Sequence, residues 1–232
     1  MTIWQTITGA AQAAARSDAI APLLKALGIE VAEPSRGTAG VAFTIAIVAL
    51  SAKMAKSDGR VTDDEVAAFR RVCAFPETEA DNVRRVFDLA KRDIAGFETY
   101  ARQIKDVLGD DAQLKRDVLE GLFVIAAADG ILHEREDAYL HRVADLIGIP
   151  ASEVAWIRSL FVTADADPYT ILGLKPGASN EEVRARHRQL VLENHPDRLI
   201  GRGVPAEFVA IAEKTLAAIN NAYDQLKRER GL

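Results

Sequence analysis

Apolar side chains recur every three or four residues along most of this 232-residue chain. That spacing places them on one face of an α-helix, whereas a half-buried strand would alternate apolar and polar residues, and no segment sustains such alternation. Three segments show the helical pattern most clearly, at Val41, Ile45, Val48 and Ala52; at Val83, Val86, Phe87 and Ala90; and at Leu114, Val118, Leu122 and Ile125. The pattern therefore predicts an all-α protein.

The longest uncharged stretch, residues 37–52, is 16 residues long. A helix needs about 20 apolar residues to cross a membrane, and this stretch contains Thr38 and Thr44 and runs into Lys53. We interpret it as a buried core helix and expect no transmembrane segment. The N-terminus has no basic cluster followed by an apolar core, so we expect no signal peptide either.

The following region contains an internal repeat. The sequence from Asp58-Gly59 onward matches the sequence from Asp129-Gly130 onward, 71 residues later. Each copy consists of an apolar helix, an Asp-Gly turn and a helix that begins with acidic residues. On this repeat, residues 38–161 resemble the TerB domain of tellurite-resistance proteins.

Six acidic residues of the repeat form a candidate metal site: Asp58, Asp63, Glu65, Asp129, Glu134 and Glu136. Their oxygen ligands suit a hard divalent cation, and the resemblance to TerB domains implies an association with metal. The same residues also have a purely structural interpretation, since Asp-Gly favours a turn, Thr62 with Glu65 forms a capping box and acidic residues stabilise helix N-termini. His133, at the corresponding cap position, is a poor ligand for an oxygen site. Both interpretations stay open.

The C-terminal part carries its own helix signals. Asp167 followed by Pro168 predicts a helix N-terminus, because aspartate caps a first turn and proline needs no backbone N–H there. Ser179 with Glu182 forms a capping box and predicts a second helix. Apolar periodicity predicts a third helix over residues 208–226. We expect the second and third helices to pack through Val183, Leu190, Phe208, Ile211 and Ile219.

His195-Pro196-Asp197 lies between the second and third helices. A helix, a basic helix, this tripeptide and a third helix, in that order, resemble a J domain. J domains belong to DnaJ-type co-chaperones, which stimulate ATP hydrolysis by DnaK-type chaperones. The resemblance implies that His195 and Asp197 contact such a chaperone and bias it towards its hydrolysing state. Pro196 would hold the two flanking residues in a defined loop.

Arg184 and Arg188 lie four residues apart and share one face of the second helix, which leads towards His195. Arginine presents a planar, permanently charged fork to carboxylates, so we expect these two residues to belong to the chaperone-binding surface. Taken alone, they would equally fit a solvated helix face, and Pro196 a simple helix stop.

Three positions depart from the J-domain pattern. His187 and Asn194 stand where J domains usually carry tyrosine, and Gln189 stands where a basic residue is common. The smaller number of basic residues on this helix affects how tightly a chaperone would bind more than which chaperone would bind.

A TerB-like domain followed by a J domain resembles the arrangement of DjlA-type co-chaperones. We divide the chain into an alanine-rich N-terminal segment (residues 1–37), a TerB-like domain (38–162) and a J domain (163–232). DjlA-type proteins carry a membrane anchor in the N-terminal region, which this sequence lacks, so we expect a soluble, cytoplasmic relative. An N-terminal segment that rests on a membrane or pairs two chains is the alternative.

Composition excludes several functional classes. The net charge is −5 and no basic run is present, which argues against nucleic-acid binding. The single cysteine, Cys73, excludes an internal disulfide and a cysteine-rich zinc module. No glycine-rich phosphate loop is present and no nucleophile accompanies His195 and Asp197, so we expect no enzyme.

The sequence therefore predicts a co-chaperone that docks on a DnaK-type chaperone and stimulates its ATP hydrolysis without a cofactor. The TerB-like domain would give client choice, location or oligomeric state, a homo-oligomer included. The sequence ends soon after the third helix, so we expect no glycine-rich or client-binding region there. The alternative function is a metal-responsive stress adaptor whose acidic repeat binds divalent cations.

Overall fold

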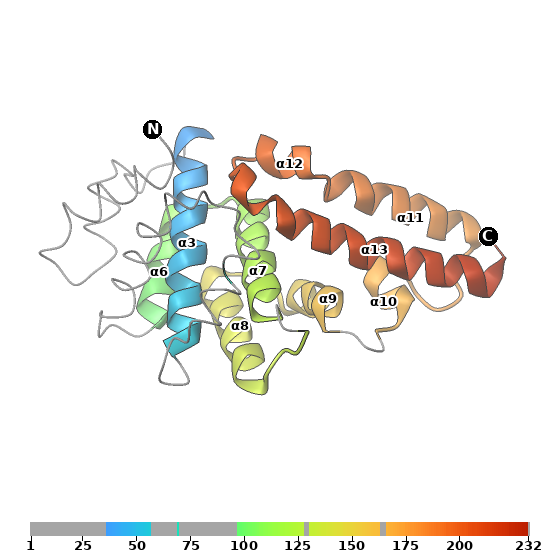
Figure 1. Ribbon diagram of the computed structural model, residues 1–232, viewed down its shortest axis with the longest axis horizontal. Coiled ribbons are helices and arrows are strands. Elements are labelled where there is room, and N and C mark those ends of the chain that lie inside the picture. The colour runs from blue at the N-terminus through green and yellow to red at the C-terminus, as the bar shows by residue number, and fades with distance from the viewer. Residues whose placement is uncertain (1–35, 57–68, 70–96, 128–129, 163–165, 232) are drawn as a thin grey trace, which may run out of the picture.

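The computed structural model describes residues 36–56, 69, 97–127, 130–162 and 166–231. Every regular element in these ranges is a helix, which confirms the predicted all-α fold. The helices fall into two sets (Figure 1). The first set is α3 (Arg36–Lys56), α6 (Phe97–Leu108), α7 (Ala112–Ala126), α8 (Glu134–Ile147) and α9 (Ala151–Phe161). The second set is α10 (Pro168–Leu172), α11 (Asn180–Glu193), α12 (Pro196–Gly201), the 3₁₀ helix η2 (Ala206–Phe208) and α13 (Val209–Arg230).

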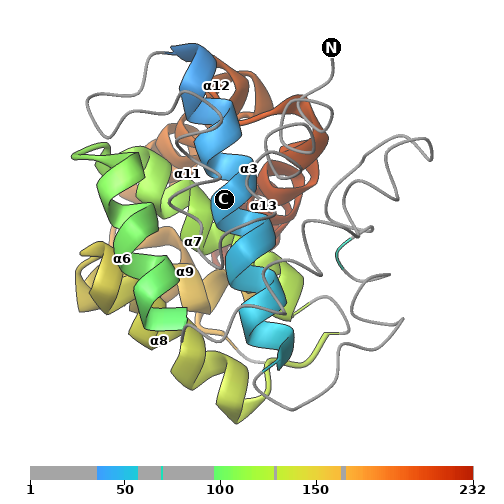
Figure 2. The same ribbon diagram turned by 90° about the vertical axis from the view of Figure 1, so that its left-hand side faces the viewer.

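Helix α3 is the buried helix of the first set. It runs alongside α6 (Figure 2) and also packs against α7. Residues 43–50 are all buried, so this part of the helix is enclosed on every side rather than along one stripe. This confirms the interpretation of residues 37–52 as a core helix. Among the described residues, no helix is both long and apolar enough to cross a membrane.

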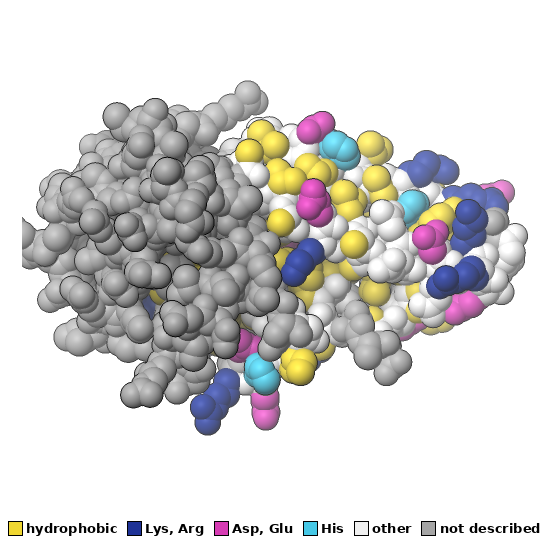
Figure 3. Space-filling view, in the orientation of Figure 1, with side chains coloured by type: hydrophobic (Ala, Val, Ile, Leu, Met, Phe, Trp, Pro, Cys, Tyr) yellow, Lys and Arg dark blue, Asp and Glu magenta, His cyan; other side chains and the backbone are white. Residues whose placement is uncertain are grey.

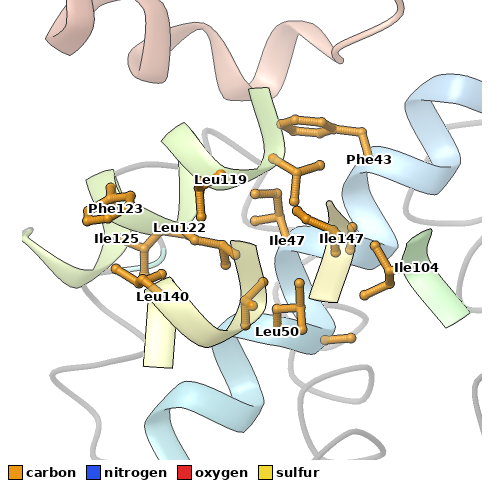
Figure 4. Packing of buried hydrophobic residues seen from close by; sticks show 14 of the residues in the cluster. Phe43, Ile47, Leu50, Ile104, Leu119, Leu122, Phe123, Ile125, Leu140 and Ile147 are labelled. Atoms are coloured by element: carbon orange, nitrogen blue, oxygen red, sulfur yellow. The ribbon is translucent and has the colours of Figure 1, made fainter. Parts of the chain in front are cut away.

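Helix α7 supplies the other large share of this core. The predicted face of Leu114, Val118, Leu122 and Ile125 is confirmed, since all four side chains are buried. Figure 4 shows side chains of α7 interleaved with those of α3 and α8. Burial of these side chains removes apolar surface from water and holds the three helices together. The pattern predicted around Val83 lies outside the described residues.

The expected packing of Phe208 and Ile211 against Val183 and Leu190 is wrong. Phe208 and Ile211 belong to the core built on α3 and α7, whereas Val183 and Leu190 belong to a separate core. The reason is that α13 is longer than α11. Its 22 residues extend about 33 Å, so its first turns lie past the end of α11. Phe208 reaches Phe43 of α3, with ring centroids 5.0 Å apart and an edge-to-face angle of 79°.

A glycine on α7 allows three helices to meet. A Cβ atom on Gly121 would lie 2.6 Å from Ile47 Cδ1 of α3 and 2.9 Å from Ile211 Cδ1 of α13. Any larger residue would displace one of these side chains. The second set of helices therefore packs directly into the core of the first.

A second contact joins the two sets through α9 and α10. The indole Nε1 of Trp156 donates a hydrogen bond to the backbone oxygen of Ile171 (3.0 Å). Leu160 of α9 also lies in the core that contains Val183 and Leu190. The two sets are thus held at two separate places.

An acidic residue of α7, Glu120, is buried where α13 crosses. Its Oε2 accepts a hydrogen bond from Thr215 Oγ1 of α13 (3.2 Å), while its Oε1 has no hydrogen-bond partner among the described residues. Burial, with Asp117 as a like charge nearby, raises the pKa of Glu120 to about 8. The carboxyl group is therefore neutral at pH 7, which avoids a buried charge.

This pKa predicts that the fold loses stability as the pH rises from about 4.5 to about 8. The unfolded-state pKa is near 4.5 and the folded-state pKa near 8, so the folded protein binds more protons between these values. The Glu120 contribution is fully present below pH 4.5 and is lost as the pH rises to 8, by at most about 1.4 kcal/mol per pH unit. We expect Glu120→Gln to flatten this fall, measured by urea unfolding between pH 5 and 8.5. The control Glu213→Gln, at an exposed position of α13, should leave it unchanged, and an equally steep fall in Glu120→Gln would contradict the account.

Candidate functional site

Two capping arrangements begin the helices of the second set. Asp167 caps α10 and accepts a hydrogen bond from the backbone amide of Thr170 (3.2 Å), with Pro168 in the first turn. Ser179 Oγ accepts from the backbone amide of Glu182 (3.2 Å), and the Glu182 carboxylate accepts from the backbone amide of Ser179 (2.6 Å). The latter hydrogen bond lowers the pKa of Glu182. Both predicted helix starts are confirmed.

Helices α11 and α13 lie side by side as a hairpin (Figure 1). Val183 and Leu190 of α11 share a buried cluster with Ile219 of α13, as predicted for these three residues. Because one face of α11 is committed to this core, the opposite face is turned to solvent.

Arg184 and Arg188 lie on the solvent face of α11. Both are exposed, and neither makes an ion pair with a residue that the structure describes. Lys and Arg side chains gather over the outer end of the hairpin (Figure 3). The intervening Arg186 differs, because its Nε donates to the backbone oxygen of Leu172 (3.1 Å) and its guanidinium lies 3.7 Å from Glu193 Oε2. Arg186 thus ties α11 to α10, whereas Arg184 and Arg188 remain open to a partner.

The His-Pro-Asp tripeptide begins a helix of its own. Helix α11 ends at Glu193, and His195 is the N-cap of α12, with Pro196 in its first turn. His195 Nδ1 accepts from the backbone amide of Asp197 (3.3 Å) and lies 3.6 Å from Asp197 Oδ2. The two side chains are 51% and 87% exposed. We call these three residues the His-Pro-Asp corner; its backbone is fixed and its side chains are accessible.

An open hollow of about 500 Å³ lies beside this corner, lined by Gln189, Leu192, Glu193, His195 and Arg198. Leu192 is 66% exposed, an unusual position for a large apolar side chain. Sequence reasoning missed Leu192 and Arg198. The available signal for Leu192 was its place two residues after Leu190, which puts it across the helix from the buried face.

The two substituted tyrosine positions are occupied by residues with structural contacts. His187 stacks on Tyr223 of α13 with ring centroids 4.0 Å apart, and a hydrogen bond of 2.8 Å joins its Nε2 to Asn220 Oδ1. Asn194 is buried and donates to the backbone oxygen of Leu190 (2.8 Å). His187 therefore joins α11 to α13, and Asn194 closes the C-terminal end of α11.

The candidate metal residues are only partly described. Asp58, Asp63, Glu65 and Asp129 lie outside the described residues. Glu134 and Glu136 begin α8, and Glu136 accepts a hydrogen bond from the backbone amide of His133 (3.0 Å). Among the residues with described positions, no three His, Cys, Asp or Glu side chains group as metal ligands would. The divalent-cation site stays a prediction.

Comparison with known families separates the chain into the same two kinds of domain. The model for the tellurite resistance protein TerB matches residues 44–159, and the model for the DnaJ domain matches residues 167–231. Helices α10 to α13 with the exposed corner therefore form a J domain. The chain belongs to the TerB family, whose model covers half of its residues, and joins that domain to a C-terminal DnaJ domain.

Several curated relatives match the chain along most of their length, and each is named co-chaperone protein DjlA. The Aliivibrio fischeri protein is 24% identical over 224 residues, covering 82% of this chain and 79% of its own length. The Photobacterium profundum protein is 27% identical, covering 82% and 78%. The Escherichia coli K12 protein is 26% identical, covering 77% and 76%. No solved structure matches the chain. The domain boundaries at residues 37 and 162 stay predictions.

Proposed function

We propose that this protein is a co-chaperone that docks on a DnaK-type chaperone through its J domain and stimulates ATP hydrolysis by that chaperone. The observation that carries the proposal is the accessible His-Pro-Asp corner at the end of a helix with two exposed arginines, within a DnaJ domain. The names of the relatives support the same role. The protein would act as an effector and catalyse no reaction itself.

The surface chemistry supports a two-part contact. Arg184 and Arg188 would meet carboxylates of the chaperone and accelerate encounter. The hollow beside Leu192 and His195 would receive an apolar side chain, because an exposed leucine gains most when a partner covers it. The chaperone would thereby be held in the conformation that hydrolyses ATP, which is the conformation that this surface binds better.

Reversing the charge of both arginines tests the docking surface. We expect Arg184→Glu/Arg188→Glu to raise the concentration of protein that half-maximally stimulates ATP turnover by at least about tenfold, since like charges would then face the chaperone. The half-maximal concentration of the wild-type protein should itself rise with added salt, because screening weakens exposed charge pairs. In the double variant this dependence should become flat or reversed.

The matched control is Lys227→Glu/Arg228→Glu, which makes the same charge change at exposed positions near the end of α13. It should leave the half-maximal concentration close to that of the wild type. Equal effects of the two double variants would mean that net charge, rather than the face of α11, governs docking.

The TerB domain would supply client choice, location or oligomeric state. These finer roles, the predicted homo-oligomer and the predicted cytoplasmic location stay predictions. Co-purification of proteins with the full chain and with an Arg184→Glu/Arg188→Glu variant would separate clients from the chaperone itself.

A further inference from the structure

Helix α12 is tied at its far end to the TerB domain. Arg202, the C-cap of α12, donates from Nε and Nη2 to the two carboxylate oxygens of Asp117 on α7 (3.0 and 2.8 Å). Its Nη1 donates to the backbone oxygen of Glu193 at the end of α11 (3.4 Å). One guanidinium therefore joins α7 to the two helices that flank the His-Pro-Asp corner.

This ion pair is largely shielded from water. The Asp117 side chain is 3% exposed and that of Arg202 is 24% exposed. Burial raises the pKa of Asp117, and Arg202 offsets part of that rise. A two-contact fork fixes orientation as well as distance, and removing one partner leaves the other charge without compensation. The pair therefore specifies one placement of α12 on α7.

Apolar contacts act on both sides of Arg202. Leu199 and Val204 are each 2% exposed, and both belong to the hydrophobic core of the TerB domain. The two side chains pack in the core of the TerB domain rather than in the core that α10, α11 and α13 share. The helix that begins at His195 is thus held by the neighbouring domain rather than by α11 and α13 alone.

The contact does not hide the His-Pro-Asp corner. The side chains of His195 and Asp197 are 51% and 87% exposed while α12 is held in this way. An autoinhibitory contact would cover them. The geometry fits a device that fixes the direction in which the corner points.

We propose that Asp117 and Arg202 are positioning residues for the His-Pro-Asp corner, through which the TerB domain holds α12 in the orientation that docks on the DnaK-type chaperone. This inference rests on the proposed function. When the tie is loosened, only a fraction of the molecules present the corner correctly, and the apparent dissociation constant rises by the reciprocal of that fraction. At saturating concentration the maximal stimulation is recovered, because bound molecules have adopted the docking orientation.

The test compares full-length variants in steady-state ATP turnover by the chaperone. We expect Asp117→Asn and Arg202→Gln to raise the half-maximal concentration at least about fivefold, with the maximal rate and the salt dependence of the wild type. Arg202→Lys should lie between them and the wild type, because it keeps the charge and loses the fork. The control Asp145→Asn removes the exposed ion pair with Arg142 in the same domain and should change nothing.

Hydrogen exchange on the same proteins identifies the cause. Amides of residues 197–201 should exchange faster in Asp117→Asn, while those of α11 keep the wild-type rate. An unchanged half-maximal concentration, or a higher stimulation than that of the wild type, would overturn the inference. If Asp117→Asn does not fold, the half-maximal concentration of Arg202→Lys alone tests the inference, because this variant leaves Asp117 a charged partner. These results are separable from failure of the proposed function, in which the wild type itself gives no stimulation.

Discussion

Replacing His195 by Gln is expected to reduce the stimulation of ATP turnover by a DnaK-type chaperone at least about tenfold, even at saturating concentration. His195 Nδ1 accepts the hydrogen bond of the Asp197 backbone amide, and half of its side chain faces solvent. Gln cannot place a rigid, planar ring at this corner. In the proposed mechanism this contact distinguishes two conformations of the chaperone, so adding more protein should not restore the lost stimulation. Steady-state ATP hydrolysis at increasing protein concentration measures the maximal rate.

The matched control is His133→Gln, the same replacement at the N-cap position of α8. It should leave the maximal rate unchanged. Asp197→Asn should behave as His195→Gln does, because its carboxylate is 87% exposed in the same corner. Full stimulation by both corner variants would remove the proposed mechanism.

Replacing Phe208 by Ala is expected to lower the free energy of unfolding by about 3 to 5 kcal/mol. Phe208 is fully buried against Phe43 of the TerB domain, although it stands at the start of the third J-domain helix. The cavity would open between α3 and α13 and cannot be refilled by the hairpin. Urea denaturation of the full chain measures the change. The exposed Ile200→Ala serves as the control for loss of an apolar side chain from the same region.

The place where the variant destabilises the fold matters as much as the size of the effect. Hydrogen exchange in Phe208→Ala should become faster in α3 and α7, whereas Ile219→Ala, in the hairpin core, should act mainly on α10 and α11. Unchanged exchange in α3 and α7 of Phe208→Ala would mean that the two domains are stabilised independently.

Much of the fold could be predicted from the sequence because the decisive signals are local. The cap at Asp167 and the capping box of Ser179 with Glu182 each depend on residues two or three positions apart. The apolar face of α7 depends on a spacing of three and four residues. The order of helix, basic helix and His-Pro-Asp likewise needs no knowledge of distant contacts.

The contacts between the domains could not be predicted in this way. Asp117 and Arg202 lie 85 residues apart in sequence, and Glu120 and Thr215 lie 95 apart. On α7 alone, an acidic residue among apolar ones is equally compatible with an exposed face. Phe208 fits the apolar stripe of α13 whichever core it enters, so periodicity assigns it to a buried face but not to a partner.

Helix α12 was missed for a related reason. From the sequence, Pro196 is expected to end the basic helix, and α11 does end just before it, at Glu193. Proline also favours the first turn of a new helix, and six residues are too few for periodicity to reveal one. The short helix is stable here because Leu199 is buried in the TerB domain.

Hydrogen exchange of the full chain with and without an ATP-bound DnaK-type chaperone tests the central claim most directly. The account predicts slower exchange in α11 and in residues 194–201 when the chaperone is present, with α8 unchanged. The same footprint should vanish in Arg184→Glu/Arg188→Glu at equal concentrations. Protection confined to the TerB domain, or no protection at any concentration that stimulates ATP turnover, would contradict the account.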